Sequence, residues 1–199
     1  MRVERIGDAT LYHGDALDVL PTLGRVNAVV SDPPYPNNAG HFMAAIDSAR
    51  EFLRRVYCEQ AIVFWSELEK PTLLLPLVAV HVWHRANVNG RPYEPAYHFQ
   101  SGGQKRRSDV FTHAAIFDGV GPGCHEYVVH PTQKPVALME KLIRKTEGLI
   151  LDPFMGSGTT GVACAQLGRK FIGIEIERKY FDIACERIDN AYRQQRMFA

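Results

Sequence analysis

Short apolar segments that each end at an acidic residue constrain the fold of this chain more than any other feature. They are Val26–Val30 before Asp32, Leu149–Leu151 before Asp152 and Phe171–Ile174 before Glu175. Segments with helical spacing alternate with such apolar runs, and this alternation favours an α/β fold with a mainly parallel sheet. Ligands of open α/β sheets bind beyond the carboxyl ends of the strands. The three acidic residues therefore mark a candidate site.

The remaining segments extend the same pattern. We expect further strands at residues 10–13, 61–65, 78–83 and 110–117, and helices at about 41–56, 134–148, 158–167 and along the last segment. Residues 87–109 are the least regular stretch, rich in glycine and proline. The chain has no internal repeat, low-complexity tract or linker, so residues 1–199 are interpreted as one domain.

Composition narrows the function classes. Of the 199 residues 46% are hydrophobic and 23% charged, which is ordinary for a globular protein. No apolar run reaches the length of about 20 residues that a membrane span needs, and no signal peptide opens the sequence. Four scattered cysteines without a C-x-x-C pair suggest a reducing cytoplasm. With a formal net charge of only +1, any nucleic-acid surface must be a local patch.

A glycine turn between a strand and a helix predicts a nucleoside pocket. Gly156-Ser157-Gly158 follows the strand that ends at Asp152, and Glu175 ends the next strand, near the separation of about 20 residues expected for a carboxylate that binds a ribose. A dinucleotide site is the alternative, but the third glycine of that motif is missing. A phosphate-binding P-loop lacks its G-K-[ST]. A turn whose glycines only permit packing stays open.

Asp32-Pro33-Pro34-Tyr35 follows a buried strand and resembles a catalytic motif for an aromatic amine. The two prolines stiffen the backbone and remove two N–H donors, so the Asp32 carboxylate and the Pro33 carbonyl are left as acceptors. Hydrogen bonds from an exocyclic amino group to these acceptors would localise its lone pair for attack on a methyl sulfonium. Tyr35 would stack on a base flipped out of the duplex. The alternative is a proline-rich turn with a capping aspartate.

Taken together, these motifs resemble the permuted DNA amino-methyltransferases, the β group in which the catalytic motif precedes the cofactor motif. The resemblance covers nearly the whole chain. Its matches are Gly14-Asp15, Asp32 to Tyr35, His130-Pro131-Thr132-Gln133-Lys134-Pro135, Asp152 to Thr160 and Gly173-Ile174-Glu175.

The resemblance implies a Rossmann-like methyltransferase fold that uses S-adenosylmethionine, gives S-adenosylhomocysteine and needs no metal. It implies a seven-stranded, mostly parallel sheet with one antiparallel strand. Glu175 would hold the ribose and Asp15 would face the adenine, while Asp32 would touch both the cofactor and the target base. The residues implied at the methionine end of the cofactor are His130, Thr132, Gln133, Lys134, Asp152, Phe154, Gly156, Ser157, Gly158 and Thr159.

The implied reaction is site-specific methylation of adenine N6 in double-stranded DNA, in a bacterial or phage-infected cytoplasm. By resemblance, aspartate at the first position of the catalytic motif favours adenine over cytosine N4, although both bases present the same aromatic amino group. An RNA or protein amide methyltransferase, or an inactive DNA-binding partner subunit, remains as an alternative. The sequence leaves a homodimer and an accompanying restriction enzyme open.

Few residues of the chain are left over to recognise a DNA sequence. Only about residues 87–109 could form a short recognition loop, where Lys105, Arg106 and Arg107 could contact phosphates, with Arg85 and Arg91 as weaker candidates. A solvated loop is the alternative. His81 and His84 would point to opposite faces of a strand, which argues against a metal site.

Overall fold

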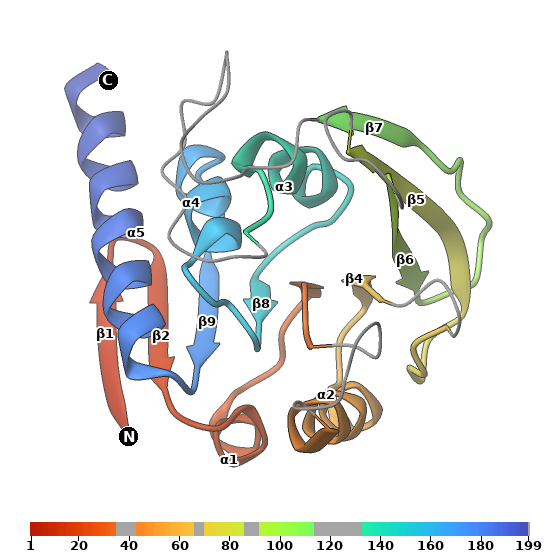
Figure 1. Cartoon of the computed structure of the whole chain (residues 1–199), viewed down its shortest axis with the longest axis horizontal. Helices are drawn as coiled ribbons and strands as arrows, with labels where there is room; N and C mark the ends of the chain where they lie inside the picture. The colour runs from red at the N-terminus through yellow and green to blue at the C-terminus, as the bar shows by residue number, and fades with distance from the viewer. Residues whose placement is uncertain (35–42, 66–69, 86–91, 114–132, 199) are drawn as a thin grey trace.

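The computed structural model describes residues 1–34, 43–65, 70–85, 92–113 and 133–198, arranged around one central sheet (Figure 1). The strands are β1 (Arg2–Ile6), β2 (Ala9–His13), β3 (Ala28–Ser31), β4 (Gln60–Phe64), β5 (Leu77–Arg85), β6 (Tyr93–Gln100), β7 (Val110–His113), β8 (Ile150–Asp152) and β9 (Phe171–Glu175). The helices are α1 (Ala16–Val19), a 3-10 turn (Leu20–Thr22), α2 (Met43–Arg55), α3 (Val136–Ile143), α4 (Thr159–Gln166) and α5 (Arg178–Phe198).

The strand order is β1-β2-β9-β8-β3-β4-β6-β5-β7. Five neighbouring strands from β2 to β4 run parallel, and β6 runs antiparallel to both β4 and β5. β2 pairs in parallel with β9, and His13 lies opposite Glu175. The mostly parallel α/β fold expected from the sequence is therefore present.

Two features differ from the expected seven-stranded sheet. The described residues form nine strands: seven correspond to the expected ones, including β7 within residues 110–117, and β1 and β6 are additional. β1 is a second antiparallel strand. β1 escapes prediction because it alternates exposed and half-buried residues without a clear apolar face. Within the stretch interpreted as a recognition loop, β6 is a central strand. Pro95 argued against it, because proline removes a ladder hydrogen bond.

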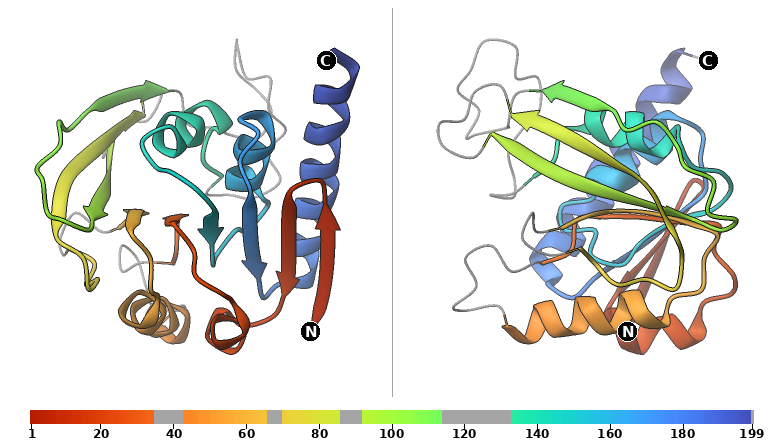
Figure 2. Two further views of the ribbon diagram at one scale, coloured as in Figure 1. Left: turned by 180° about the vertical axis from the view of Figure 1, so that it is seen from behind. Right: turned by 90° about the vertical axis from the view of Figure 1, so that its right-hand side faces the viewer.

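Helices cover both faces of the sheet (Figures 1 and 2). α3, α4 and α5 pack on one face, where a core cluster includes Val30, Phe64 and Leu138. α1 and α2 pack on the other, where a second cluster includes Val29, Phe52 and Trp65. Alternate residues of a strand such as β3 thus enter different cores, because successive side chains point to opposite faces. Within the described residues, no helix is both long and apolar enough to cross a membrane.

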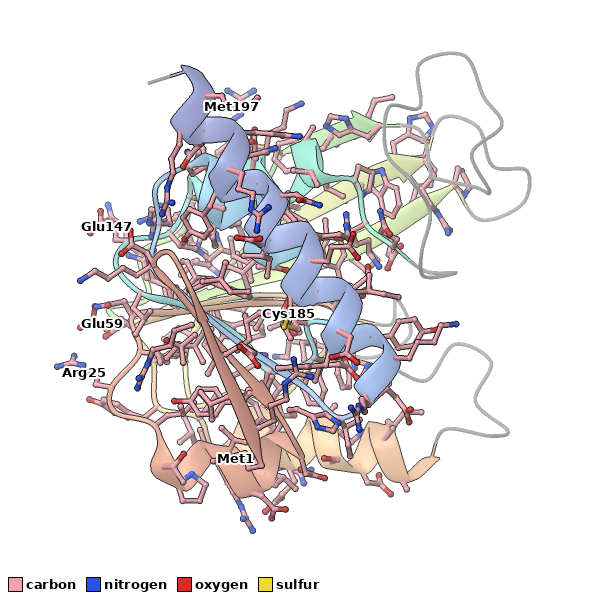
Figure 3. The ribbon with its side chains drawn as sticks, turned by 90° about the vertical axis from the view of Figure 1, so that its left-hand side faces the viewer. Met1, Arg25, Glu59, Glu147, Cys185 and Met197 are labelled. Carbon is pink, nitrogen blue, oxygen red and sulfur yellow. The ribbon has the colours of Figure 1, made fainter. Side chains whose placement is uncertain are left out.

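The two ends of the parallel strands carry different residues; they are called the amino edge, where these strands begin, and the carboxyl edge, where they end. Arg25, Glu59 and Glu147 lie together where β3, β4 and β8 begin (Figure 3), and Arg25 forms an ion pair with Glu59 at 2.5 Å. At the opposite edge the parallel strands end and antiparallel β6 begins, so Asp32, Asp152 and Glu175 gather there with residues from the start of β6. This carboxyl edge is the candidate site.

Close packing of α4 against α5 predicts the effect of a glycine substitution. A Cβ at Gly161 would overlap the Ile188 side chain and lie 2.8 Å from the Phe171 ring, so Gly161→Ala should destabilise the protein by about 1–3 kcal/mol. Alanine in a helix is normally stabilising relative to glycine, so the sign comes from packing. Thermal unfolding measures the change. Gly24→Ala is the control, since nothing lies within 4 Å of its Cβ; equal melting temperatures for the two variants would contradict the prediction.

Candidate active site

Asp32, Lys134 and Glu94 form a buried charge cluster at the carboxyl edge. The Lys134 ammonium lies 2.5 Å from Asp32 Oδ2 and 3.0 Å from Glu94 Oε1. Its Nζ also lies 4.8 Å from the centre of the Phe64 ring and 5.8 Å from that of Trp83. The sequence predicts that Lys134 borders the cofactor, and the structure shows that its ammonium contacts the Asp32 carboxylate. Glu94 was not among the residues predicted for the site.

The second oxygen of Asp32 has a different environment. Asp32 Oδ1 is buried and has no hydrogen-bond partner among the residues that the structure describes. A buried acceptor without a donor costs about 1–3 kcal/mol. An acceptor kept in this state, next to the rigid Pro33-Pro34 backbone, is suited to an N–H donor from a ligand.

Burial raises the pKa of Asp32 to about 6, while the Lys134 ammonium opposes the rise, and the charges of Glu94 and Asp152 add to it. Burial alone would lower the pKa of Lys134, but the two carboxylates raise it above its ordinary value. At neutral pH, Asp32 is therefore a carboxylate beside an ammonium. With Glu94 ionised, the cluster carries a net charge of −1.

Asp152 joins the end of β3 to the glycine turn and the start of α4. Its Oδ1 accepts the Ser31 hydroxyl at 2.6 Å and the Phe154 N–H at 3.2 Å, and its Oδ2 accepts the Thr160 hydroxyl at 2.5 Å. Burial raises the pKa of Asp152 to about 6. Because both oxygens already accept hydrogen bonds, Asp152 acts within the protein as a link between the strand end at Ser31 and α4. Ser31 and Thr160 carried no sequence signal for this role.

The two glycines of the turn differ in their surroundings. Gly156 has a φ of 52°, nothing lies within 4 Å of its Cβ position, and its N–H donates to Glu175 Oε2 at 2.9 Å. Gly158 has a φ of 84°, and its Cβ would lie 2.8 Å from that of Ala184 in α5. Its N–H donates to the Met155 carbonyl. Gly156 therefore borders open space, while Gly158 is required for helix packing.

Arg187 of α5 holds the rest of the turn. Its guanidinium donates to the Ser157 carbonyl at 2.8 Å, to the Ser157 hydroxyl at 2.9 Å and to the Thr159 hydroxyl at 3.4 Å. The Ser157 hydroxyl also donates to Gln133 Oε1 at 3.3 Å. Gln133 is thus brought to the turn, as the sequence motif suggests, but Arg187 was missed because nothing local distinguishes it from other arginines of a surface helix.

Glu175 ends β9, and Asp15 closely follows the end of the neighbouring strand β2. The Glu175 carboxylate accepts the Gly156 N–H and, at 2.7 Å, the Glu177 N–H, and burial raises its pKa. The Gly14 N–H donates to the Glu175 carbonyl at 3.0 Å, and Asp15 caps α1 through the Leu17 N–H at 2.7 Å. Ile176, beside Glu175, is 60% exposed and presents an apolar surface at this edge.

The Phe154 side chain and the basic residues Lys105, Arg106 and Arg107 lie away from the Asp32 cluster. The Phe154 ring packs edge-on against Phe52, 5.9 Å between centres, on the α2 side of the sheet. Lys105, Arg106 and Arg107 are exposed near the start of β5, where Arg106 N–H donates to the Val78 carbonyl. They are thus near the amino edge, although their role was inferred from proximity to the catalytic motif.

These three basic residues line a hollow of about 450 Å³ together with His81, His98, Gln104, Asp109 and Lys145. Arg85 ends β5 at the carboxyl edge, with its guanidinium carbon 5.8 Å from the Trp83 ring centre. Tyr35, Arg91, His130 and Thr132 lie outside the described residues. Among the described residues, no group of three or more histidine, cysteine or acidic side chains could hold a metal ion.

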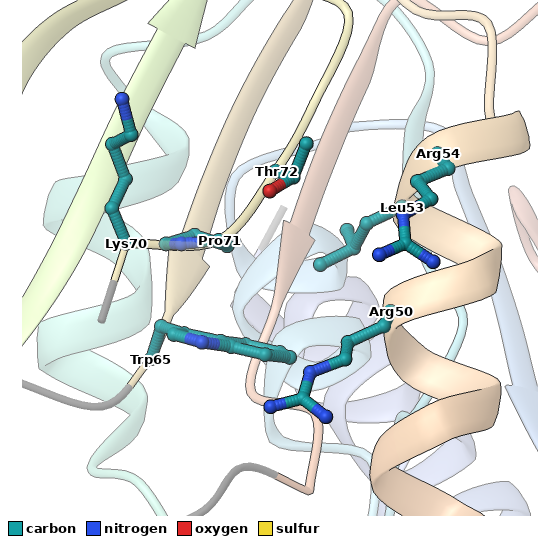
Figure 4. Close-up of a pocket in the computed structure, with 7 residues that line it drawn as sticks. All are labelled: Arg50, Leu53, Arg54, Trp65, Lys70, Pro71 and Thr72. Carbon is teal, nitrogen blue, oxygen red and sulfur yellow. The ribbon is translucent and has the colours of Figure 1, made fainter. Parts of the chain in front are cut away.

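A separate hollow of about 290 Å³ lies on the α2 side (Figure 4). Trp65 points toward α2, with Arg50 beside its ring, and Leu53, Arg54, Lys70, Pro71 and Thr72 complete the lining. None of the residues predicted for catalysis or the cofactor lines it. Trp65 belongs to the α2-side core and Phe64 to the other, so the sheet separates this hollow from the Lys134 cluster.

Known protein sequences match parts of this chain. A family model described as DNA methylase matches residues 59–186. The type II methyltransferase M2.LlaDCHI of Lactococcus lactis subsp. cremoris is 54% identical over 63 residues, 30% of this chain and 23% of its own length. M.ScaI of Streptomyces caespitosus is 39% identical over 88 residues, 43% of this chain and 29% of its own. The matches thus span about a quarter of these relatives.

Solved structures match over most of the chain. The M1.HpyAVI–SAM complex is 26% identical with a TM-score of 0.64, covering 91% of this chain and 99% of that one. The cytosine-N4-specific PvuII DNA methyltransferase is 16% identical with a TM-score of 0.69, covering 95% and 93%. The latter likeness concerns the fold, which is the Rossmann-like fold of methyltransferases.

The charge cluster predicts opposite shifts of one pKa. Lys134→Met removes the ammonium and should raise the pKa of Asp32 above about 6, while Glu94→Gln removes a repelling charge and should lower it, each by about one unit. Carboxyl ¹³C NMR titration measures both. Asp152 is the internal control, because its shift comes from burial and from Ser31, Thr160 and Phe154. Shifts of the same sign in both variants would refute this electrostatic account.

Proposed function

Since the chain belongs to the N6/N4 DNA methylase family, we propose that it is a site-specific DNA methyltransferase that transfers a methyl group from S-adenosylmethionine to N6 of adenine. The family match covers residues 59–186, more than half of the chain. The observation that carries the proposal is the partnerless Asp32 Oδ1 at the carboxyl edge. The type II relatives support a role beside a restriction enzyme.

Asp32 and Pro33 would bind the target amino group. Its two N–H donors match the Asp32 Oδ1 and Pro33 carbonyl acceptors, and these hydrogen bonds turn the nitrogen lone pair away from the ring. Pro34 fixes the backbone, and Tyr35, outside the described residues, would stack on the flipped base. A base inside a duplex cannot reach such a pocket, so flipping is part of the proposal.

Asp32 would also receive the proton. When the nitrogen forms its bond to the methyl carbon, it becomes positively charged and must lose one N–H proton, which Asp32 Oδ1 is placed to accept. The net charge of −1 on the Asp32, Lys134 and Glu94 cluster stabilises the positive charge that arrives on the nitrogen. Proton release to solvent then restores the carboxylate.

The carboxyl edge fits S-adenosylmethionine. Bound there, this cofactor supplies an electrophilic methyl group on a sulfonium sulfur and leaves as S-adenosylhomocysteine. The open space at Gly156 admits a ligand beside the backbone, and Glu175, oriented by two backbone N–H groups, has lone pairs left for a ribose diol. Asp15 and the exposed Ile176 would flank the adenine.

The methionine end would lie along the glycine turn. Gln133, Ser157 and Thr159 are held there through Arg187, and His130 and Thr132 complete the proposed set outside the described residues. Asp152, Phe154 and Gly158 would support this end from behind, since their described contacts are with the protein. Lys134 would border both the cofactor and the base.

Double-stranded DNA is the proposed partner. Arg85 lies at the carboxyl edge and suits a contact near the flipped base, with Arg91 proposed from sequence alone. Lys105, Arg106 and Arg107, joined by Lys145 around the hollow near the start of β5, offer a positively charged surface for phosphates farther along the duplex. The homodimer remains a proposal without a described interface.

Cytosine N4 is the second candidate base, favoured by the fold likeness to the cytosine-N4-specific PvuII enzyme. The two acceptors suit either amino group. The resemblance of Asp32-Pro33-Pro34-Tyr35 to adenine-specific motifs is the reason to place adenine first.

Labelled methyl transfer to unmethylated duplex DNA, followed by digestion and mass identification of nucleosides, tests the proposal. We expect N6-methyladenine, and Asp32→Asn should lower the rate by at least about 100-fold, because one acceptor becomes a donor. Asp47→Asn, an exposed aspartate of α2, is the control. Detection of N4-methylcytosine instead would change the target base to cytosine and leave the proposed site unchanged. Label in RNA or protein, or none despite cofactor binding, would overturn the proposal.

Salt dependence tests the DNA surface. Replacing Lys105, Arg106 and Arg107 by alanine should weaken DNA binding and reduce the slope of log affinity against log salt by about 0.9 for each phosphate that the variant no longer neutralises. Fluorescence anisotropy at several salt concentrations measures the slope. The control replaces Arg54, Arg55 and Arg193, exposed arginines that are each ion-paired with an acidic neighbour. An unchanged slope in the first variant would rule out phosphate binding at these positions.

A further inference from the structure

Lys134 has more hydrogen-bonding capacity than its two carboxylates use. An ammonium has three N–H donors. Asp32 Oδ2 and Glu94 Oε1 are its hydrogen-bond acceptors among the residues that the structure describes. Its side chain is 6% exposed, so water has little access to the third donor.

The Lys134 ammonium and the partnerless acceptor belong to the same contact. Lys134 binds one oxygen of the Asp32 carboxylate, and the other oxygen, Oδ1, is the acceptor without a partner. A ligand bound at Oδ1 therefore lies close to the ammonium, because the two oxygens share one carbon atom. The complementary ligand presents a donor and an acceptor on neighbouring atoms.

The pairing edge of adenine has this arrangement, with the N6 amino group beside the N1 lone pair. Cytosine has it too, with N4 beside N3. Thymine presents an N3–H donor instead, which an ammonium would repel. The cluster therefore matches the chemical feature that the amino-bearing bases share.

Glu94 makes such a contact compatible with methylation. An ammonium at the ring nitrogen withdraws electrons from the amino group, which would weaken it as a nucleophile. Glu94 and Asp32 offset that charge, so the ammonium donates a hydrogen bond from a cluster with net negative charge. The rings of Phe64 and Trp83 confine the ammonium and keep water away, which strengthens its hydrogen bonds.

We propose that Lys134 is a specificity-determining residue that donates a hydrogen bond to the ring nitrogen next to the target amino group, N1 of adenine, and that Glu94 positions Lys134 for this contact. The inference rests on the proposed function, because it requires a flipped amino base at Asp32. It adds a direct contact to the base that neither the sequence motif nor the family match supplies.

Atomic substitution in the substrate tests the contact. Duplexes carry the methylated sequence found in the first experiment, with the target as adenine, 1-deazaadenine or 3-deazaadenine. The first analogue replaces N1 by C–H, and the second makes the same change on the far side of the ring. Single-turnover methyl transfer is measured for each. The wild-type protein should discriminate against 1-deazaadenine about 10- to 100-fold more than against 3-deazaadenine, as expected when a hydrogen bond to a charged group is removed.

Variants of the chain complete a double-mutant cycle, in which intrinsic differences in amine reactivity cancel. Lys134→Met should be slower on adenine and should lose at least about tenfold of the discrimination against 1-deazaadenine. Glu94→Gln should lose part of the discrimination against 1-deazaadenine, whereas Glu94→Asp, which keeps the negative charge, should retain more of it. A role of Glu94 in folding alone would not produce this difference. Equal melting temperatures and cofactor affinities check the variants.

Each outcome decides one question. If unmodified adenine duplex is methylated and the wild-type protein treats both analogues alike within about twofold, the Lys134 contact is overturned even if no variant folds. If discrimination survives unchanged in Lys134→Met, another group contacts N1 and the inference is likewise overturned. If unmodified DNA receives no methyl group, the proposed function itself fails, and the inference fails with it. If the methylated base is cytosine, the same experiment is done with 3-deazacytosine in place of 1-deazaadenine.

Discussion

The arrangement of the site depends on the hydrogen bonds that the buried Asp152 carboxylate accepts. It binds Ser31 at the end of β3 and Thr160 at the start of α4, so two segments far apart in the sequence have one fixed relation. Asp32 follows Ser31 directly, and Gly156 lies between Asp152 and Thr160. The carboxylate proposed to bind the amine and the turn proposed to border the cofactor are therefore held in a fixed relation by Asp152. Hydrogen bonds to a buried carboxylate are among the stronger neutral-to-charged contacts, which suits this role.

The carboxylates of Asp32 and Glu94 both bind the ammonium of Lys134. Leaving one oxygen of Asp32 without a donor is unfavourable in the protein alone, and surrounding packing must offset that cost. Such sites are places where local stability yields to ligand binding, because the missing hydrogen bond is supplied by the ligand. The aromatic rings beside Lys134 belong to the same core cluster as the helices above the sheet, so the cluster is anchored in well-packed structure.

Strand ends and the glycine turn could be predicted from the sequence because each is a local pattern. Apolar runs correctly predicted β3, β8 and β9, and the acidic residues after them lie at the carboxyl edge, as expected. β6 was missed because Pro95 and flanking glycines resemble a loop, although the Pro95 carbonyl accepts the Trp65 N–H and the strand lies between β4 and β5. The Lys134–Asp32 and Glu94–Lys134 contacts join distant segments, and no periodicity encodes them. Arg187 and Ser31 are equally silent in sequence, since only the packing of α5 and the sheet order bring them to the turn.

The pairing of β2 with β9 also has a consequence for biosynthesis. β1 and β2 are translated early, but β2 acquires its parallel neighbour only after β9 has been made, and α5 then adds the Arg2–Asp182 ion pair and the Tyr192 hydroxyl that accepts the Asp8 N–H. Non-local pairing of this kind folds slowly. Asp15 follows β2 and Glu175 ends β9, so these two carboxylates, proposed for the nucleoside end of the site, are translated far apart in time. Until β9 emerges from the ribosome, the β1–β2 hairpin therefore has an unpaired edge along β2, the edge that β9 later covers.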